Sequence, residues 1–358
     1  MAGALTQVSY SYILIIMEVK MKKGFILLFF ILSFFILSLF VFAILKSSDY
    51  SKSKVTKRIK YTNNFDTSKT SELYKENKYE EAETIVLEYL KSYPNDILAL
   101  SEKAYIAISK GENEEGLILI DKLLLVDPNN DSLLNNKSWA YNNLGLFNLA
   151  LNYAEMSLKI KPTDEYDYLN KANALYGLEK YEEALKFYDL AIGVNNKFDY
   201  AYYGKGLCLK ESNDYAAAFL NFKIAYEITP TDNEYFDELV NSCIELKKYN
   251  EIIQFSDKRI SIDSKDSTAY YSKAEAYAYL QQYENSLKFY DESIKYSEYV
   301  ADALYGKCKV YIKLNDKNKA YENLTKALAA DEEYVYYIDA NELKLLKGYK
   351  DFDNLISE

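Results

Sequence analysis

The side chains that enzymes most often use for nucleophilic and metal chemistry are scarce in this sequence. Its 358 residues include no histidine, which excludes Ser-His-Asp and Cys-His nucleophile systems, a histidine general base and histidine metal ligands. The three cysteines, Cys208, Cys243 and Cys308, are widely dispersed and form neither a CxxC pair nor a zinc pattern. We therefore expect inert core thiols, no metal site and no disulfide framework.

Three other patterns suggest chemistry but lack a required part. Gly204-Lys205-Gly206 has no third glycine at the spacing of a phosphate-binding loop. The carboxylate pairs Glu80-Glu81 and Glu182-Glu183 recur at equivalent places, as a solvated helix face would. Asp351-Phe352-Asp353-Asn354 lacks the glycine and the downstream glutamate of a calcium loop. We predict no catalytic residue and no cofactor, and hence a protein that is not an enzyme.

Charge is distributed unevenly along the chain. Residues 1–60 contain nine basic and two acidic side chains, a net charge of +7. Residues 61–358 contain 34 basic and 52 acidic side chains, a net charge of −18. An acidic body repels phosphate backbones, so we do not expect nucleic acid as a ligand.

Residues 24–45 form a candidate membrane segment. Phe25–Leu45 contains only apolar residues apart from two serines, and as a helix it would extend about 31 Å, one hydrocarbon core. It has no polar face, unlike a helix at the surface of a soluble protein. We favour an uncleaved transmembrane or signal-anchor helix; a signal peptide cleaved after Ala43 is the alternative.

The flanks of this segment leave its orientation open. Residues 1–23 form a short tail, and residues 1–20 are a candidate mis-annotated extension, because codons for Met17–Met21 can contain a bacterial ribosome-binding sequence. Residues 46–62 form a basic juxtamembrane linker, suited to anionic surfaces or simply solvated. The lysines before the segment favour a cytoplasmic N-terminus by the positive-inside rule, whereas the larger number of basic residues after it favours the reverse orientation. We favour a single-pass protein with an extracytoplasmic body.

The rest of the chain repeats with a period of 34 residues. The four prolines, Pro94, Pro128, Pro162 and Pro230, lie 34, 34 and 68 residues apart. A fixed period in this range indicates a solenoid. Residues 63–334 divide into eight copies without gaps, which begin at Asn63, Ile97, Asp131, Glu165, Asp199, Asn233, Ser267 and Ala301.

Each copy has the pattern of two helices. Position 34 carries residues that cap a helix N-terminus: Asp96, Asn130, Asp164, Asp232 and Asp266. Position 15 carries residues that tolerate the left-handed end of a helix: Asn77, Gly111, Gly145, Asn213 and Asn315. Small residues recur at positions 8 and 20 and tyrosine at position 17, a pattern that favours two closely packed helices with aromatic rings between pairs.

This pattern resembles the tetratricopeptide repeat (TPR) family over residues 63–334, and specifically a membrane-anchored bacterial member. The resemblance implies an all-α fold, a right-handed superhelix of helical hairpins after a single N-terminal membrane helix. Residues 335–358 would form a capping helix, Val335–Lys347, and a tail. Two copies depart from the pattern: the first helix of the Asn63 copy is polar, and the Asn233 copy has Ile252 and Arg259 at positions 20 and 27.

In TPR proteins the first helices line a concave groove, and this implies a candidate binding site in copies two to four. The predicted groove residues are Tyr105, Asn135, Trp139, Asn142, Asn143, Tyr166, Asn170, Asn173 and Tyr176. Aromatic rings offer contact area, and amides pair with an extended peptide backbone. Because tyrosine and asparagine are abundant throughout the chain, composition alone also accounts for them.

Copies five to seven present a different, acidic face. Its members are Glu211, Glu234, Asp237, Glu245 and Glu275, which either attract basic peptides or are part of the general negative charge. Position 5 carries no lysine or arginine, so the carboxylate clamp of chaperone-cofactor TPR domains is absent. The sequence thus predicts a membrane-tethered, non-enzymatic scaffold that binds a protein or peptide. The alternative is an exported wall- or glycan-binding module that uses the same aromatic residues.

Overall fold

The computed structural model describes residues 61–339, 343–349 and 352. The predicted tail, the predicted membrane segment and nearly all of the basic linker lie outside these residues. Within the described part, no helix combines the length and the apolar character needed to cross a bilayer.

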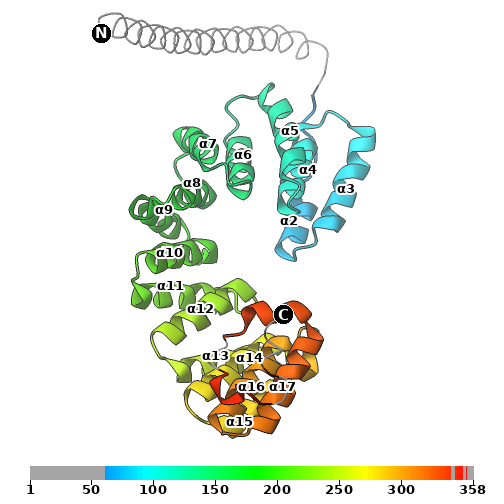
Figure 1. Cartoon of the computed structure of the whole chain (residues 1–358). Coiled ribbons are helices and arrows are strands. Elements are labelled where there is room, and N and C mark those ends of the chain that lie inside the picture. The colour runs from blue at the N-terminus through cyan, green and yellow to red at the C-terminus, as the bar shows by residue number, and fades with distance from the viewer. Residues whose placement is uncertain (1–60, 340–342, 350–351, 353–358) are drawn as a thin grey trace, which may run out of the picture. The chain divides into compact units, whose positions relative to one another are not determined.

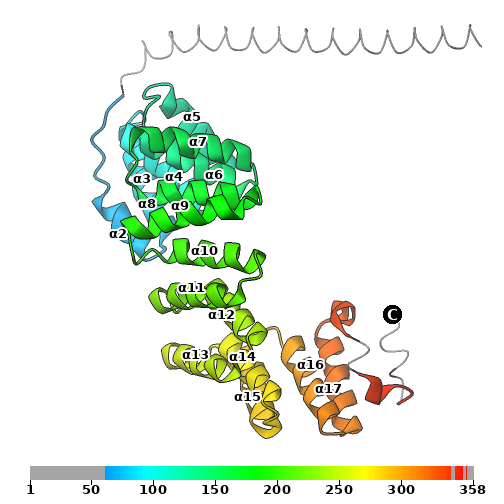
Figure 2. The ribbon, with the colours of Figure 1, turned by 90° about the vertical axis from the view of Figure 1, so that its left-hand side faces the viewer.

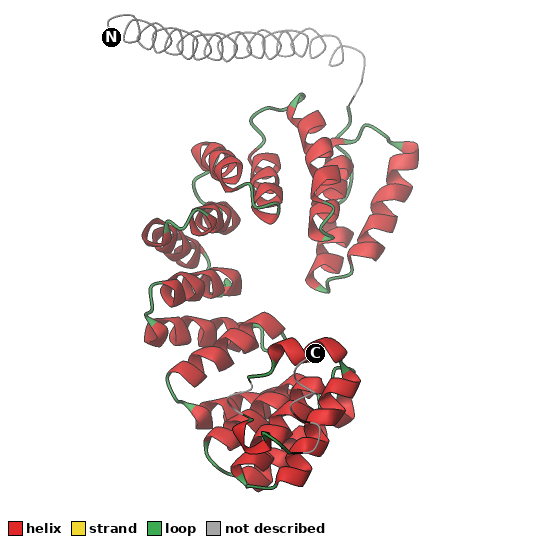
Figure 3. Cartoon of the chain, in the orientation of Figure 1, coloured by secondary structure: helices red, strands yellow, loops and turns green. Residues whose placement is uncertain are grey.

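The described residues form sixteen α-helices joined by short turns, with no named strand among them (Figures 1 and 3). The first helices of the eight copies are α2 (Ser68–Lys75), α4 (Ile97–Ser109), α6 (Asp131–Asn143), α8 (Glu165–Gly177), α10 (Asp199–Glu211), α12 (Asn233–Glu245), α14 (Ser267–Tyr279) and α16 (Ala301–Lys313). The second helices are α3 (Tyr79–Ser92), α5 (Asn113–Leu124), α7 (Phe147–Ile160), α9 (Tyr181–Val194), α11 (Tyr215–Ile228), α13 (Tyr249–Ile262), α15 (Tyr283–Tyr296) and α17 (Lys317–Ala330). In seven copies the first helix begins at the first residue of the predicted repeat.

Side chains at position 34 fix where these helices begin. Asp96 accepts a hydrogen bond from the backbone N–H of Ala99 at 3.1 Å, and Asp266 accepts one from Ala269 at 2.8 Å. Asn130, Asp164 and Asp232 cap their helices in the same way. Each cap satisfies a donor that the first helical turn leaves without an intrahelical partner.

Left-handed residues end the first helices. Asn77, Gly111, Gly145, Asn213 and Asn315 all have positive φ, as predicted. Glu179, Lys247 and Gln281 adopt the same conformation in the other copies, although their side chains disfavour it. The packing of the repeat therefore determines the left-handed conformation of this turn residue, even where its side chain disfavours that conformation.

Small residues allow the two helices of a hairpin to approach closely. The alanines at positions 8 and 20 are fully buried. A Cβ atom on Gly206 would lie 2.5 Å from the ring of Phe222, which is itself fully buried. Two of the position-17 tyrosines stack on a neighbouring ring: the ring centroids of Tyr249 and Tyr279 are 4.8 Å apart, and those of Tyr79 and Tyr74 are 5.8 Å apart. This packing forms the core between the helix layers.

The chain divides into two compact units, of which the first ends at Leu133. Its core includes Phe65, Ala82, Val86 and Ile106. Helix α2 has only eight residues, in keeping with its polar sequence, and Thr70 is buried where it bonds to Glu102 at 2.8 Å.

The second unit, residues 134–358, contains successive hydrophobic clusters along the helix pairs. Figure 2 shows helices α8 to α11 of this unit following one another along the stack. The α12–α13 hairpin packs less extensively than α10–α11 or α14–α15. Its position 20 is the buried Ile252, where other copies have a small residue. The larger side chain at this position accounts for the looser packing of the copy that the sequence marked as a departure from the pattern.

Position 27 of the same copy holds a buried ion pair. The Arg259 Nε lies 2.6 Å from Asp266 Oδ2, and both side chains are less than a tenth exposed. Its Nη2 donates to Asn233 Oδ1 at 2.7 Å, and its guanidinium lies 4.6 Å from the centroid of the Phe236 ring. This network replaces the apolar contact of a regular repeat and ties α12, α13 and the start of α14 together.

The C-terminal segment differs from the predicted capping helix over residues 335–347. It contains two short 3-10 helices, η1 (Glu332–Tyr337) and η2 (Lys344–Leu346), because Ile338 adopts an extended conformation that ends the first. Leu343, Leu346 and Phe352 are buried against the cluster of α16 and α17. The segment therefore covers the last apolar face, although without the expected α-helix.

Candidate functional site

The predicted groove residue of the first unit is Tyr105 on α4. Its side chain is half-buried, and its ring centroid lies 4.8 Å from that of Tyr74 on α2. The Tyr74 hydroxyl donates to Glu102, and burial together with this bond raises the pKa of Tyr74. Tyr105 thus belongs to an aromatic pair on the first helices of this unit.

In the second unit, three of the predicted asparagines bond to one another. Asn170 on α8 is buried, and its Nδ2 donates to Asn135 Oδ1 on α6 at 2.6 Å. The Nδ2 of Asn142 donates to the backbone carbonyl of Asn170 at 2.8 Å. These hydrogen bonds join consecutive first helices and engage the amide nitrogens of Asn142 and Asn170 within the chain. They help to fix the spacing between α6 and α8 on this face.

Asn173 is also engaged inside the unit. Its Oδ1 accepts a hydrogen bond from the Tyr188 hydroxyl at 2.8 Å. Burial raises the pKa of Tyr188 well above its usual value, which keeps that hydroxyl protonated and able to donate. The contact fixes the side chain of Asn173 on α8 against α9.

The predicted groove residues differ in how accessible they are, and only Tyr166 and Asn143 are exposed. Tyr166 is 50% exposed and lies 4.9 Å from the ring of Phe198, edge to face. Tyr176 is half-buried 5.6 Å from Tyr181, and Trp139 is half-buried on α6. Asn143, at the end of α6, is exposed. The ring of Tyr166 and the amide of Asn143 therefore offer the most accessible contact area among the predicted residues.

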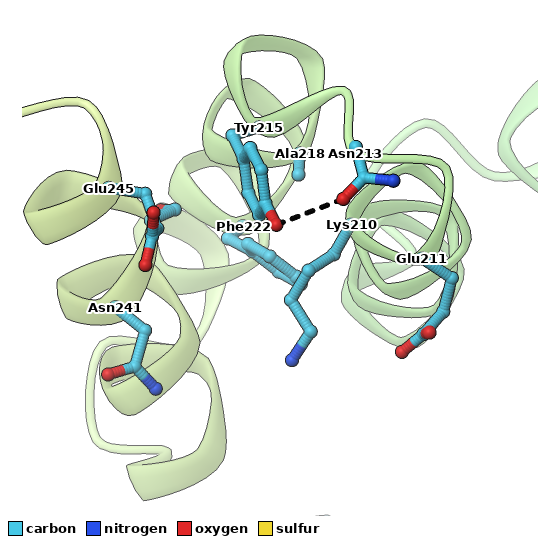
Figure 4. A pocket seen from close by; sticks show the side chains of 9 residues that line it. Lys210, Glu211, Asn213, Tyr215, Ala218, Phe222, Asn241 and Glu245 are labelled. Atoms are coloured by element: carbon cyan, nitrogen blue, oxygen red, sulfur yellow. Dashed lines mark hydrogen bonds between the residues drawn. The ribbon is translucent and has the colours of Figure 1, made fainter.

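A pocket of about 350 Å³ opens between α10, α11 and α12 of the second unit. Phe222, Ala218 and Ser242 lie at its base. Its rim consists of polar side chains from three elements: Lys210, Glu211, Asn213, Tyr215, Asn241 and Glu245. Figure 4 shows Lys210 extending between Glu211 on one side and Asn241 and Glu245 on the other. The pocket combines an apolar base with charges of both signs, an arrangement typical of ligand sites.

Lys210 is held in place by an ion pair. Its Nζ lies 2.8 Å from both carboxylate oxygens of Glu238 on α12. Burial, and the charges of Glu211 and Glu238, raise the pKa of the nearby Tyr176 to about 12. Partial burial also raises the pKa of Asp237, against the opposing effect of Arg259. Glu211 on α10 and Glu238 on α12 therefore both act electrostatically on Tyr176 of α8.

Sequence reasoning identified part of this pocket and missed part of it. Glu211 and Glu245, two of the predicted acidic residues, line it from α10 and α12. Lys210 and Asn241 were missed, although they occupy positions 12 and 9 of their copies. The same positional rule that selected Trp139 and Tyr176 would have found them in copies five and six.

The patterns discounted in the sequence lie in helices and cores. Gly204 and Gly206 are inside α10 and face aromatic rings rather than forming a loop. The cysteines are fully buried and free, and burial raises the pKa of each thiol to about 12. The part of the chain that the structure describes brings together no cluster of metal-ligating side chains.

Comparison with protein families identifies these repeats. Models described as tetratricopeptide repeat match residues 169–233, and residues 267–299 and 301–334. The search of curated proteins found no match. The family matches and the helical-hairpin solenoid together support the TPR family for this chain.

Many solved structures share the fold. The C-terminal part of a TPR repeat-containing protein from Cytophaga hutchinsonii has a TM-score of 0.55 at 17% identity, and the match covers 69% of this chain and 99% of that one. The Cut9–Hcn1 hetero-tetramer of APC/C matches with a TM-score of 0.51 at 15% identity, over 78% of this chain and 54% of that one. YrrB, "a TPR protein with an unusual peptide-binding site", has a TM-score of 0.42 at 22% identity, over 51% of this chain and 93% of that one. Identities this low show the fold alone.

Proposed function

We propose that this TPR chain is a non-enzymatic, membrane-tethered scaffold that binds a peptide segment of a partner protein along the first helices of its second unit. The single observation that carries the proposal is the pocket between α10, α11 and α12. TPR domains bind protein or peptide partners, and this pocket combines an apolar base with polar side chains from two first helices, α10 and α12.

The chemistry of this face defines the kind of segment that it accepts. Tyr166 and Tyr176 offer ring surfaces that lose little side-chain entropy on binding. Glu211 and Glu245 favour a basic group above the apolar base of the pocket, and Lys210, already paired with Glu238, can donate a further hydrogen bond to a backbone carbonyl oxygen. An extended segment with both apolar and basic residues satisfies these groups.

The binding test uses a random dodecapeptide library, selected on the full chain in a non-ionic detergent. Affinities of the selected peptides are then measured for the wild-type chain and for the variants Tyr176→Ala, Lys210→Ala and Glu245→Gln. We expect each variant to weaken binding about three- to tenfold, as interface residues near a pocket centre do. Trp139, the only tryptophan in the chain, supplies an intrinsic fluorescence signal on the same helix face.

Leu220 provides the matched control. It lies on α11, a second helix, and its side chain is 58% exposed. Leu220→Ala should leave the affinities unchanged. Peptides whose affinity falls with Leu220→Ala but not with the three pocket variants would place binding on the other helix layer and refute the proposal.

Membrane tethering is the second part of the proposal, and it rests on the apolar run Phe25–Leu45. Alkaline carbonate should leave the full chain in the membrane pellet, because a spanning helix is not released by high pH. A chain that begins at residue 61 should be soluble under the same treatment. Protease added outside intact cells, with lysed cells as the control, should remove the repeats if the body is extracytoplasmic, as we favour.

The wall- or glycan-binding alternative makes a different prediction for the same aromatic residues. Purified wall polymer would then compete with the selected peptides, and Tyr166→Ala would weaken polymer binding. No competition by polymer is the outcome that the peptide proposal requires.

A further inference from the structure

A second cavity, separate from the pocket of α10 to α12, lies at the C-terminal end of the second unit. It has a volume of about 380 Å³ and opens between the start of α16 and the turn after α17. Glu298, Tyr299 and Asp302 line it on the α16 side, and Asp331, Tyr334 and Tyr337 line it on the η1 side. Figure 2 shows α16 and α17 side by side in this part of the fold.

The aromatic rings of this cavity are unusually open to solvent. Tyr299 is 86% exposed and Tyr337 is 75% exposed, whereas most large apolar side chains of the unit pack in cores. Tyr334 links them to the interior, since its ring lies 5.9 Å from Tyr337 and 5.8 Å from the buried Tyr305. Tyr299 and Tyr337 therefore present open ring surface in the lining of a cavity, where a ligand can pack on it.

The charged side chains that line the cavity are all negative. Its lining contains three carboxylates and no basic side chain. The N-terminus of α16 adds roughly half a positive charge and the C-terminus of α17 roughly half a negative one, so the helix ends cancel and the carboxylates decide the sign. Each carboxylate also keeps accepting capacity: Asp302 takes one bond, from the Tyr334 hydroxyl at 2.8 Å, and Asp331 takes one, from the N–H of Glu333 at 3.0 Å.

We propose that this cavity binds an arginine side chain of a partner polypeptide. Tyrosine faces attract cations, and the planar guanidinium can stack on a ring while its N–H groups reach two carboxylates at once. The chain already uses this chemistry internally: Lys309 lies 5.1 Å from the centroid of Tyr305, and Arg259 lies over Phe236. The Tyr334 hydroxyl stays protonated, because burial and its bond to Asp302 raise its pKa.

The site is independent of the peptide face on α8, α10 and α12, because it shares no lining residue with that pocket. A partner segment that also touches the peptide face would gain affinity from both sites, but neither requires the other. Failure of one proposal therefore leaves the other standing.

The experiment uses saturation-transfer NMR on the full chain in a non-ionic detergent. The probes are three blocked Gly-Ser nonapeptides whose central residue is arginine, lysine or citrulline. We expect the arginine peptide to bind, with the strongest transfer to its side-chain δ protons, the lysine peptide to bind several-fold more weakly, and the citrulline peptide not to bind. Equal transfer to all three peptides would overturn the proposal.

Variants locate the binding. Tyr299→Leu combined with Tyr337→Leu should weaken binding of the arginine peptide about threefold to tenfold, and Glu298→Gln about threefold. Tyr299→Phe keeps the ring and should change the affinity less than twofold. These side chains are exposed, so the variants should fold normally.

The matched controls carry the same changes next to the cavity but outside its lining. Tyr336, which is 79% exposed, is the control for the tyrosine variants. Glu332, in η1, is the control for Glu298→Gln. Tyr336→Leu and Glu332→Gln should not affect binding. If these controls weaken binding as much as the cavity variants do, or if only Glu211→Gln and Glu245→Gln weaken it, the arginine does not occupy this cavity.

Discussion

At the scale of single residues, small side chains decide how closely the helices of a hairpin approach. Gly206 on α10 faces the buried ring of Phe222, and an added Cβ would lie 2.5 Å from it. Gly193 on α9 has no atom within 4 Å of the same position. The two glycines therefore make a matched pair, one required by packing and one not.

Gly206→Ala should destabilise the second unit by about 2 kcal/mol, because Phe222 is enclosed and cannot move without strain. Gly193→Ala should instead stabilise it by up to about 1 kcal/mol, since alanine is the better helix former. Urea denaturation followed by circular dichroism measures both midpoints. Equal effects of the two substitutions would mean that the close approach at Gly206 is not needed.

Backbone conformation provides a second prediction at this scale. Lys247 has a φ of 54°, a conformation that costs a residue with a side chain about 1 kcal/mol relative to glycine. Lys247→Gly should raise the free energy of unfolding by about 0.5–1 kcal/mol. Gly111→Ala, at a φ of 83° in the first unit, should lower it by a similar amount. A loss of stability in Lys247→Gly would show that its side chain contributes more than its backbone strain costs.

The sequence was enough to predict the role of those residues whose side-chain type alone determines it. The capping aspartates, the left-handed asparagines and the small residues of positions 8 and 20 lie where the pattern placed them. The groove asparagines are different, because an amide can bond to a ligand or to a neighbour equally well. The partner of Asn170 is Asn135, one repeat away, and only the packing of consecutive first helices brings the two together.

At the scale of elements, the α12–α13 hairpin departs most from its neighbours. The Arg259–Asp266 ion pair is almost fully buried there. Removing one partner of such a pair leaves an uncompensated charge in the protein interior, which costs several kcal/mol. In a solenoid the loss should stay local, because each repeat contacts only its neighbours.

Arg259→Ala should therefore destabilise the unit by about 3 kcal/mol and increase amide hydrogen exchange in α12, α13 and α14 in particular. Lys326 is the control, since its pair with Glu322 on α17 is more than half exposed. Lys326→Ala should cost about 0.5 kcal/mol or less. Uniform exchange throughout the unit after Arg259→Ala would contradict the local role of this network.

Element boundaries were predictable where the period holds and not where it ends. The repeat pattern placed the helices of residues 63–334 because each copy repeats the same caps and turns. After Tyr334 no further copy constrains the chain, and the apolar spacing of Ile338 and Leu345 suggested an α-helix. Instead, the extended conformation of Ile338 ends η1, and Leu343, Leu346 and Phe352 are buried against the face of α16 and α17.

At the scale of the whole molecule, architecture and charge could be predicted but the ligand could not. A 34-residue period implies a solenoid because a single hairpin cannot bury its apolar face alone. The net negative charge of residues 61–358 could be counted from the sequence. Where carboxylates gather on the surface depends on which first-helix positions lie close together in the fold. The pocket of α10 to α12 forms where one helix turn and the neighbouring hairpin meet, and spacing along the chain does not reveal that opening.

The central claim, that the first helices of the second unit bind a partner protein, is tested most directly by photo-crosslinking in the cells that produce the chain. A photoreactive phenylalanine analogue replaces Tyr176 on the first-helix face in one strain and Leu220 on the second-helix layer in another. We predict a discrete crosslinked protein from the Tyr176 position that disappears with Lys210→Ala, and no such product from Leu220. Equal crosslinking from both positions, or none from Tyr176, would contradict the claim.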